Sequence, residues 1–220
     1  MDRVRLALAK TLQQGAETLG VEISARQQQQ LLDYLQLLYR WNRTYNLTAI
    51  TDQSQAVSRH LLDSLAVVPH IEAQRLLDVG SGGGLPGVVI AIMRPDMALT
   101  LLDSNSKKCR FLVQVKGELG LQRLNVLHSR LEHYSPEPRH DAIISRAFAS
   151  LATMVRLCAP CLTPNGQLLA MKGRLEESEL NELTRLIPIE QTLSLTVPGL
   201  EQEQRHLLLL YPKGVTQWPK

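Results

Sequence analysis

The chain has 220 residues, 44% of them hydrophobic and 20% charged, as in an ordinary soluble globular protein of one domain, with or without an added helical segment. No apolar run reaches the roughly 18 residues of a membrane span and no signal h-region adjoins the N-terminus, so the sequence predicts a cytoplasmic protein without a membrane partner. The net charge of +3 permits a nucleic-acid substrate without demanding one, and an aromatic content of 4% argues against a base-stacking platform.

The first 74 residues are expected to form a helical extension. Apolar residues recur at helical spacing over 3–18. Ser24 is the expected N-cap of a second helix, with Gln27 at the capping-box position. A third helical stretch runs from about 54 to 68 and is closed by Pro69.

From Arg75 onward, short β-like runs alternate with helical runs. Such alternation predicts parallel strands joined by right-handed crossovers, and therefore an open, doubly wound α/β sheet. The last two strands follow each other through Pro198-Gly199 without a helix, so we expect an antiparallel hairpin. Seven strands that end in such a hairpin have the Rossmann-like, mostly parallel layout of S-adenosylmethionine (SAM) dependent methyltransferases. We expect one domain over 1–220, with its α/β core at 75–220. The predicted strands are 75–79, 98–103, 124–128, 141–145, 167–172, 189–197 and 205–211, and the predicted helices are about 86–93, 106–119, 150–158 and 176–186.

The first predicted strand runs directly into a glycine-rich loop that extends from Gly80 through Gly82 to Gly87. Glycines let the backbone turn sharply and approach a ligand closely, at the edge where ligands bind to open α/β sheets. Pro86 suits the first turn of the next helix, whose free N–H groups can face an anion. Asp78 precedes the first glycine by two residues, in the Asp-x-Gly-x-Gly form typical of methyltransferases. The loop therefore predicts contacts to the methionyl part of SAM.

Gly82 to Gly87 also satisfies Gly-x-Gly-x-x-Gly, the dinucleotide fingerprint. The position of Asp78, the distance of this match from the strand end and the lack of a second substrate domain argue against a dehydrogenase. Asp103 closes the second strand and is the expected carboxylate for two ribose hydroxyls in either family, with helix capping as the alternative. Glu132 follows the third strand, where the adenine edge usually lies, although a solvated turn residue would have the same sequence.

The cysteines Cys109, Cys158 and Cys161 do not form a disulfide framework, and no further ligands lie at zinc spacing, so we expect core thiols and no metal. The fourth-strand exit, 141–148, lacks the Asn/Asp-Pro-Pro-aromatic sequence of enzymes that methylate exocyclic amines. Pyrimidine C5 methylation needs a cysteine nucleophile, and Cys161 lies inside a helix-like run. This favours an acceptor that is already nucleophilic, such as guanine N7 with its in-plane lone pair. We therefore expect no general base and no covalent nucleophile.

Four sequence runs stand out together: Arg-Trp-Asn-Arg-Thr-Tyr-Asn-Leu-Thr at 40–48, Arg-His-Leu-Leu-Asp-Ser at 59–64, the loop 78–87 with its Gly-Leu-Pro-Gly ending, and Ser-Arg-Ala-Phe-Ala at 145–149. In this combination the chain closely resembles RsmG (GidB), the bacterial family of 16S ribosomal RNA guanine-N7 methyltransferases. The resemblance spans nearly the whole chain, from about Leu32 to Leu210, and the combination is far more specific than the glycine loop alone.

The resemblance implies SAM as the methyl donor and guanine 527 in the 530 loop of 16S rRNA as the acceptor. It implies that the partner is 16S rRNA, within the 30S ribosomal subunit or an assembly intermediate, and that the enzyme is a monomer. Another RNA or a small molecule as the acceptor, and a non-catalytic nucleotide-binding module, are the alternatives. The SAM contacts that it implies fall on Gly80, Leu85, Leu131, Glu132 and Arg146, with Asp103 as the expected ribose ligand.

Candidate RNA contacts lie before and inside the α/β core. Arg43, Asn46, Arg59 and His60 are each compatible with helix caps or solvated faces, but their clustering before the cofactor segment favours a surface that faces the substrate. Lys107 and Lys108 follow the ribose aspartate and are expected either to meet RNA phosphates or to form a solvated helix face.

Overall fold

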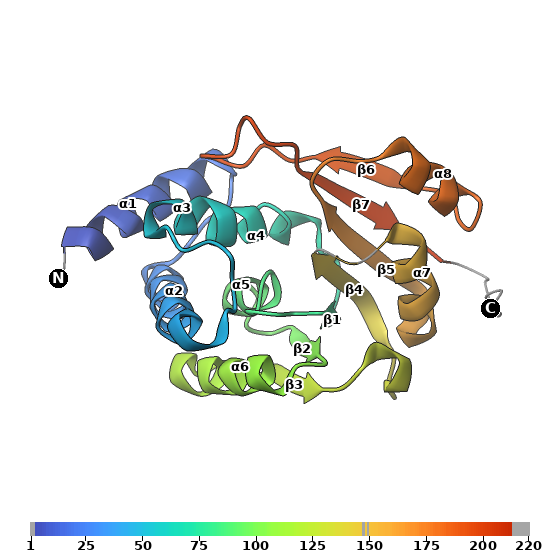
Figure 1. Cartoon of the computed structure of the whole chain (residues 1–220), viewed down its shortest axis with the longest axis horizontal. Coiled ribbons are helices and arrows are strands. Elements are labelled where there is room, and N and C mark those ends of the chain that lie inside the picture. Colours follow the sequence, from blue (N-terminus) through green and yellow to red (C-terminus); the bar gives the residue numbers. More distant parts are fainter. Residues whose placement is uncertain (1–2, 147, 149, 213–220) are drawn as a thin grey trace.

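The computed structural model describes residues 3–146, 148 and 150–212. Within them, seven strands form one sheet in the order β3-β2-β1-β4-β5-β7-β6 (Figure 1). The pairs among β1 to β5 are parallel, and β7 is antiparallel to both β5 and β6, which confirms the mostly parallel sheet and its closing hairpin. The strands are β1 (Arg75–Val79), β2 (Ala98–Asp103), β3 (Leu124–His128), β4 (His140–Arg146), β5 (Leu162–Lys172), β6 (Gln191–Ser194) and β7 (His206–Leu210).

Two strands differ by more than one residue at an end from the sequence prediction. β5 begins at Leu162 rather than at 167, because Leu162 pairs with His140 before a register shift that brings Gln167 opposite Ala142. The residues between these two pairs include the sequence Pro-Asn-Gly, which favours turns. β6 is shorter than the predicted 189–197, since only Gln191–Ser194 pair with β7 at the edge of the sheet.

Alternate residues of the strands face two hydrophobic clusters on opposite sides of the sheet. Leu76 and Ile144 point to the first cluster, whereas Leu77 and Ile143 point to the second. This period of two is what a strand buried on both faces requires. The first cluster is covered by α5 (Gly87–Met93), α6 (Ser106–Leu119) and the N-terminal extension, and the second by α7 (Leu151–Cys158) and α8 (Glu177–Thr184).

The N-terminal extension shares the first cluster with the α/β core (Figure 1). Its helices α1 (Arg3–Thr18) and α2 (Ala25–Tyr45) match the prediction, and Ser24 and Gln27 form the expected capping box. Gln27 and Gln30 also donate from α2 to backbone carbonyls of residues 92, 93 and 119 in the core. None of the described helices has the length and apolarity needed to cross a membrane.

The third helical stretch is not the uniform helix that the sequence predicted. It consists of α3 (Gln53–Ala56), a π-helical segment η1 (Val57–Leu62) and α4 (Asp63–Leu65), followed by a 3-10 turn at Val68–His70. In the wider π turn, the N–H of Asp63 donates to the carbonyl of Ser58. Such segments are uncommon and gather at functional sites. Apolar spacing alone does not distinguish this turn from an α-helix.

Candidate cofactor and substrate site

The glycine-rich loop leaves β1 at the point where the strand order reverses, between β1 and β4. This is the switch-point edge at which open α/β sheets bind ligands. Gly80 has a φ of 70°, which favours glycine, and a Cβ added there would meet nothing within 4 Å. The loop therefore leaves open space beside Gly80, as a bound cofactor requires.

The Asp78 side chain is hydrogen-bonded to the last residue of this loop, Gly87. Its buried Oδ2 accepts a 2.9 Å hydrogen bond from the N–H of Gly87. The predicted anion-binding helix terminus is thus already bonded to a carboxylate of the chain, and Pro86 is the N-cap of α5 rather than its first residue. Burial raises the pKa of Asp78 to about 7, and the Gly87 hydrogen bond partly offsets that rise.

Asp103, the predicted ribose ligand, lies beside the loop at the end of β2. Its Oδ2 accepts from the N–H of Gly82 at 2.8 Å and its Oδ1 from the N–H of Asn105 at 2.7 Å, and the residue is only 6% exposed. Each carboxylate oxygen keeps a second lone pair, so Asp103 can tie the loop to β2 and still accept ribose hydroxyls. The free acceptor positions of Asp103 and the open space beside Gly80 together fit SAM.

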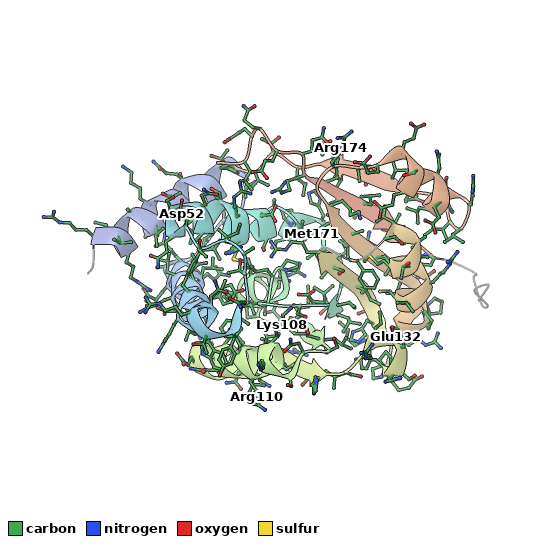
Figure 2. All side chains as sticks on the ribbon, in the orientation of Figure 1. Asp52, Lys108, Arg110, Glu132, Met171 and Arg174 are labelled. Atoms are coloured by element: carbon green, nitrogen blue, oxygen red, sulfur yellow. The ribbon has the colours of Figure 1, made fainter. Side chains whose placement is uncertain are left out.

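The other residues for which the family resemblance implies SAM contacts differ in their burial. Leu85 and Leu131 are buried in the two hydrophobic clusters, so both contribute to packing. Leu131 begins the 3-10 turn η3 (Leu131–His133) after β3, and Glu132 in that turn is exposed to solvent (Figure 2).

Tyr34 is a part of the site that the sequence did not reveal. This fully buried residue of α2 donates a 2.6 Å hydrogen bond from its hydroxyl to the carbonyl of Gly83 in the glycine loop. Burial raises the pKa of Tyr34, so its hydroxyl remains a donor. The extension therefore holds the cofactor loop directly.

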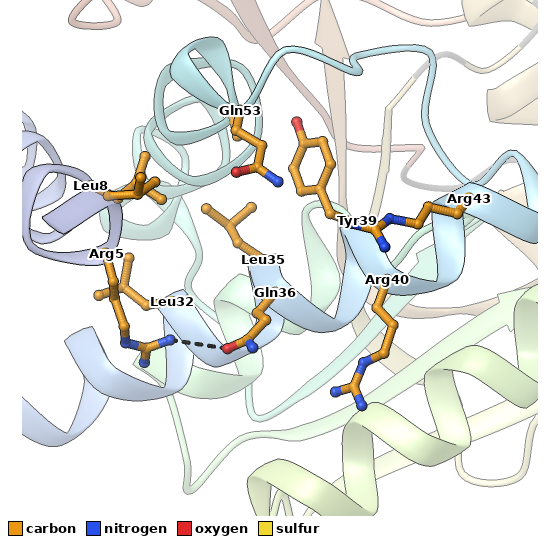
Figure 3. A pocket seen from close by; sticks show the side chains of 11 residues that line it. Arg5, Leu8, Leu32, Leu35, Gln36, Tyr39, Arg40, Arg43 and Gln53 are labelled. Atoms are coloured by element: carbon orange, nitrogen blue, oxygen red, sulfur yellow. Dashed lines mark hydrogen bonds between the residues drawn. The ribbon is translucent and has the colours of Figure 1, made fainter. Parts of the chain in front are cut away.

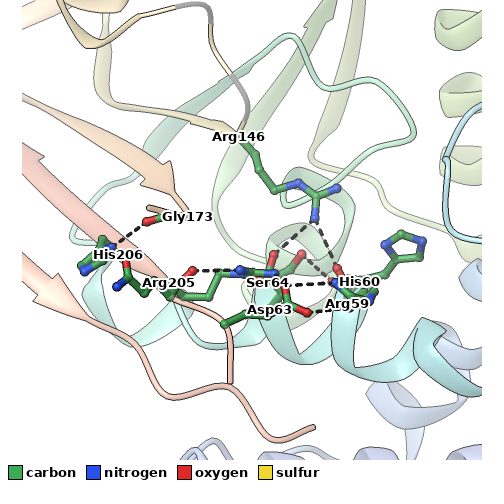
Figure 4. Close-up of polar contacts among 10 residues, drawn as sticks. Arg59, His60, Asp63, Ser64, Arg146, Gly173, Arg205 and His206 are labelled. Carbon is green, nitrogen blue, oxygen red and sulfur yellow. Dashed lines mark hydrogen bonds and ion pairs between the residues drawn. The ribbon is translucent and has the colours of Figure 1, made fainter. Parts of the chain in front are cut away.

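Arg146 lies at the end of β4, where it meets the extension (Figure 4). Its Nη1 is 3.3 Å from Oδ2 of Asp63, and Oδ1 of the same carboxylate is 3.0 Å from Nε of Arg205. The Asp63 side chain is only 7% exposed. A second bridge runs through Glu203, which pairs with both Arg205 and Arg59. Asp63 belongs to the 59–64 motif but was not predicted as a site residue, and the sequence did not single out Glu203 or Arg205.

The predicted residues Arg59 and His60 line a hollow of about 540 Å³ together with Arg146, which we call the Arg146 hollow. His60 is buried, and its Nε2 lies 3.2 Å from the hydroxyl of Thr48. Burial, with the charge of Arg146 second, lowers the pKa of His60 to about 4, so its ring is neutral at pH 7.

Arg43 and Asn46 line a neighbouring hollow of about 630 Å³, the Asn46 hollow. Asn46 ends α2 in the left-handed conformation, with φ 49°, so it also serves as a helix cap. The two hollows share Thr48 and Ala49, which places four of the predicted RNA contacts along one surface.

Lys107 and Lys108 lie in the first turn of α6, capped by Asn105. Lys107 is exposed. The Lys108 ammonium lies 4.0 Å from the position that a Cβ on Gly82 would take, so it faces the glycine loop. Figure 2 shows Lys108 and Arg110 leaving α6 on opposite sides.

All three cysteines are buried free thiols, which confirms the core assignment. Burial raises the pKa of each thiol, so Cys161 is poorly suited to act as a thiolate nucleophile. Ser145, at the end of β4, donates its hydroxyl to the carbonyl of Val79 at 2.8 Å. Ala147 and Ala149 of the same motif lie outside the described residues.

The sheet order, the glycine loop after β1 and the carboxylate after β2 define a SAM-dependent methyltransferase. A family model described as rRNA small subunit methyltransferase G (GidB) matches residues 27–208. The chain belongs to this family, as its four motifs predicted.

Relatives and solved structures agree with this assignment. The Ribosomal RNA small subunit methyltransferase G of Pseudomonas entomophila (strain L48) is 51% identical over 208 residues, which cover 94% of this chain and 96% of the relative. That of Ectopseudomonas mendocina (strain ymp) is 53% identical over 204 residues, or 92% and 95% of the two chains. A SAM dependent methyltransferase from Aquifex aeolicus shares the fold, with a TM-score of 0.60 at 14% identity over 76% of this chain and 97% of its own. A putative O-methyltransferase from Klebsiella pneumoniae has a TM-score of 0.55 at 15% identity, over 82% and 90%.

Proposed function

We propose that this protein methylates N7 of guanine 527 in the 530 loop of 16S rRNA. The observation that carries this is the exit of β4, where Ser145 is bonded to the backbone and Arg146 to Asp63. Neither side chain is a general base, and Cys161 is a buried thiol. Such a site suits an acceptor that already has a free lone pair, as guanine N7 does. Membership in the methyltransferase G family supports the same substrate.

SAM, when bound, supplies a methyl group on a positively charged sulfur, which a lone pair can attack directly. The chain's contribution is to hold the two reactants in line, because alignment alone can supply a large part of the rate. In this proposal Asp103 accepts hydrogen bonds from the ribose hydroxyls, and Gly80 and Gly82 give the methionyl part access to the backbone. Leu131 and Glu132 border the adenine.

Arg146 stands between the cofactor loop and the substrate surface. Its charge shifts the pKa values of Asp78, Tyr34 and His60, so it lies within electrostatic range of both the glycine loop and the Arg146 hollow. We assign it the alignment of SAM or of an RNA phosphate. Arg43, Asn46, Arg59, His60, Lys107 and Lys108 are the remaining proposed RNA contacts. We further propose that the enzyme is a cytoplasmic monomer whose partner is the 30S subunit or its assembly intermediate.

The test is to map 7-methylguanosine in 16S rRNA from cells with and without the gene. The proposal expects the modification at guanine 527 only when the gene is present. A modification elsewhere in the RNA would point to another acceptor, and binding of SAM without any methylated product would point to a nucleotide-binding module.

The proposed chemistry also has a kinetic signature. No proton is removed from N7, so no general base should make the single-turnover rate on 30S particles depend on pH between 6 and 8, where unperturbed histidines titrate. Because burial raises the pKa of Asp78 beneath the loop to about 7, the rates are compared at saturating SAM, so that a change in SAM affinity alone does not enter them. Arg146→Ala should lose most of this rate, and Arg146→Lys should recover only part of it, because an ammonium lacks the planar fork of a guanidinium. A steep rise in the wild-type rate through this range would contradict the mechanism.

A further inference from the structure

A third hollow continues the substrate surface along the extension, between α1 and α2 (Figure 3). It has a volume of about 380 Å³, and we call it the extension groove. It shares Tyr39, Arg43 and Gln53 with the Asn46 hollow, which in turn shares Thr48 and Ala49 with the Arg146 hollow. The three hollows therefore follow one another from the end of β4 to α1.

The lining of this path carries more cations than carboxylates, and the cations of the Arg146 hollow are each paired with a carboxylate in or beside it. Arg5, Arg40 and Arg43 line the extension groove, and five further lysines and arginines line the Arg146 hollow. Of the described residues that line the three hollows, Asp63 is the only one with a carboxylate.

The cations at the far end differ in how firmly they are held. Arg5 is paired with Asp33 at 2.7 Å. Arg40 is 60% exposed and reaches Glu118 only at 4.0 Å, a contact that is weak in water. Arg43 is exposed, and within the described part of the chain it has no ion pair. Arg40 and Arg43 lie three residues apart on α2, which places them on one face of that helix.

We infer that the extension groove binds the phosphate backbone of the rRNA segment next to the methylated guanine, with Arg40 and Arg43 as the contacts. This rests on the proposed function and deepens it, since it gives the substrate a path away from the reacting base. RNA is the occupant that the charge favours, because Arg43, which has no ion pair among the described residues, and Arg40, whose contact with Glu118 is weak, can pair with a chain of phosphates. The half-buried ring of Tyr39 also lines the groove and can stack with an unpaired base.

The experiment compares Arg40→Ala, Arg43→Ala and the double variant with Arg26→Ala. Arg26 is a matched control because it is an exposed arginine on the same helix that lines a different hollow. Binding is measured to protein-free 16S rRNA and to 30S particles lacking the methyl group, over a salt series. SAM affinity and the unfolding temperature are measured in parallel.

The double variant should bind both RNA samples at least ten-fold more weakly, with SAM affinity and unfolding temperature unchanged. The slope of log K against log salt should fall in magnitude by about 0.7–0.9 for each lost phosphate contact. Arg26→Ala should bind as the wild type does.

Two results would overturn the inference. One is a double variant that binds RNA as well as Arg26→Ala does. The other is a loss on 30S particles without any loss on protein-free rRNA, which would make a ribosomal protein the occupant. Mapping the nucleotide that the wild type methylates distinguishes a failure of the groove inference from a failure of the proposed function. If the methyl group is found elsewhere in the RNA, guanine 527 is the wrong target, and the binding data still decide whether the groove holds RNA.

Discussion

Replacing Tyr34 by phenylalanine removes one oxygen atom and tests whether the extension holds the cofactor loop. The Tyr34 hydroxyl is fully buried and donates to the carbonyl of Gly83 at 2.6 Å. The phenylalanine ring keeps the packing, so the change isolates the hydrogen bond. It leaves the buried carbonyl of Gly83 without this donor.

The expected loss follows from that burial. A hydrogen bond contributes about 0.5–1.5 kcal/mol net, but a buried polar group left unsatisfied costs about 1–3 kcal/mol. We therefore expect Tyr34→Phe to lower the free energy of unfolding by about 1–3 kcal/mol. Because Gly83 belongs to the loop that leaves β1, SAM affinity should also fall several-fold.

Tyr39 provides a control on the same helix. Its hydroxyl reaches the carbonyl of Asp52 at 3.4 Å near the surface, where water can replace it. Tyr39→Phe should change the free energy of unfolding by less than about 0.5 kcal/mol, as surface substitutions usually do. Urea unfolding without ligand and calorimetry with SAM measure the two effects. Equal stability and equal SAM affinity of the two variants would refute the claim that Tyr34 supports the loop.

Three further predictions concern the cofactor, the thiols and pH. Asp103→Ala should weaken SAM binding by about 1.5–3 kcal/mol, since it removes a charged acceptor. If calorimetry gives an unchanged SAM affinity for the folded variant, Asp103 does not bind SAM. Cys109→Ser and Cys161→Ser should keep most of the turnover in a methylation assay, whereas an inactive but folded and SAM-binding Cys161→Ser would favour covalent chemistry. Burial and then the charge of Arg146 lower the pKa of His60 to about 4, so folded His60 stays neutral while the unfolded chain gains a proton below about pH 6.5. The free energy of unfolding should therefore fall as the pH is lowered from about 6.5 to 4, and it should fall less in His60→Gln than in the wild type. Equal falls in the wild type and in His60→Gln, measured by urea unfolding, would contradict this prediction.

The features that the sequence predicted correctly are those with a local signature. Alternating strands and helices, the capping box of Ser24 and Gln27, and the glycine loop are each encoded within a few neighbouring residues. Asp103 could be placed at the sheet edge because it is the last residue of a strand, and parallel strands end at the same edge. Its hydrogen bonds to Gly82 and Asn105 could not be predicted, because they depend on how the loop turns.

The features that the sequence did not reveal join distant segments. Tyr34 and Gly83 are 49 residues apart, Asp63 and Arg146 are 83 apart, and Asp63 and Arg205 are 142 apart. A tyrosine in an amphipathic helix looks like any core residue, and an aspartate near an arginine looks like a solvated pair. Only the packed fold shows that the hydroxyl and the carboxylate are buried.

These long-range contacts give the extension a place in the proposed reaction. If methyl transfer to N7 needs no proton removed, its rate depends on how accurately SAM and the guanine are placed, and small displacements are costly. Tyr34 fixes the extension to the loop on the cofactor side, and Asp63 fixes it to Arg146 on the substrate side. The same α2 helix carries Arg40 and Arg43, the proposed RNA contacts. In this proposal the extension sets the position of both reactants, and that placement, rather than a general base or a nucleophile, supplies the catalysis.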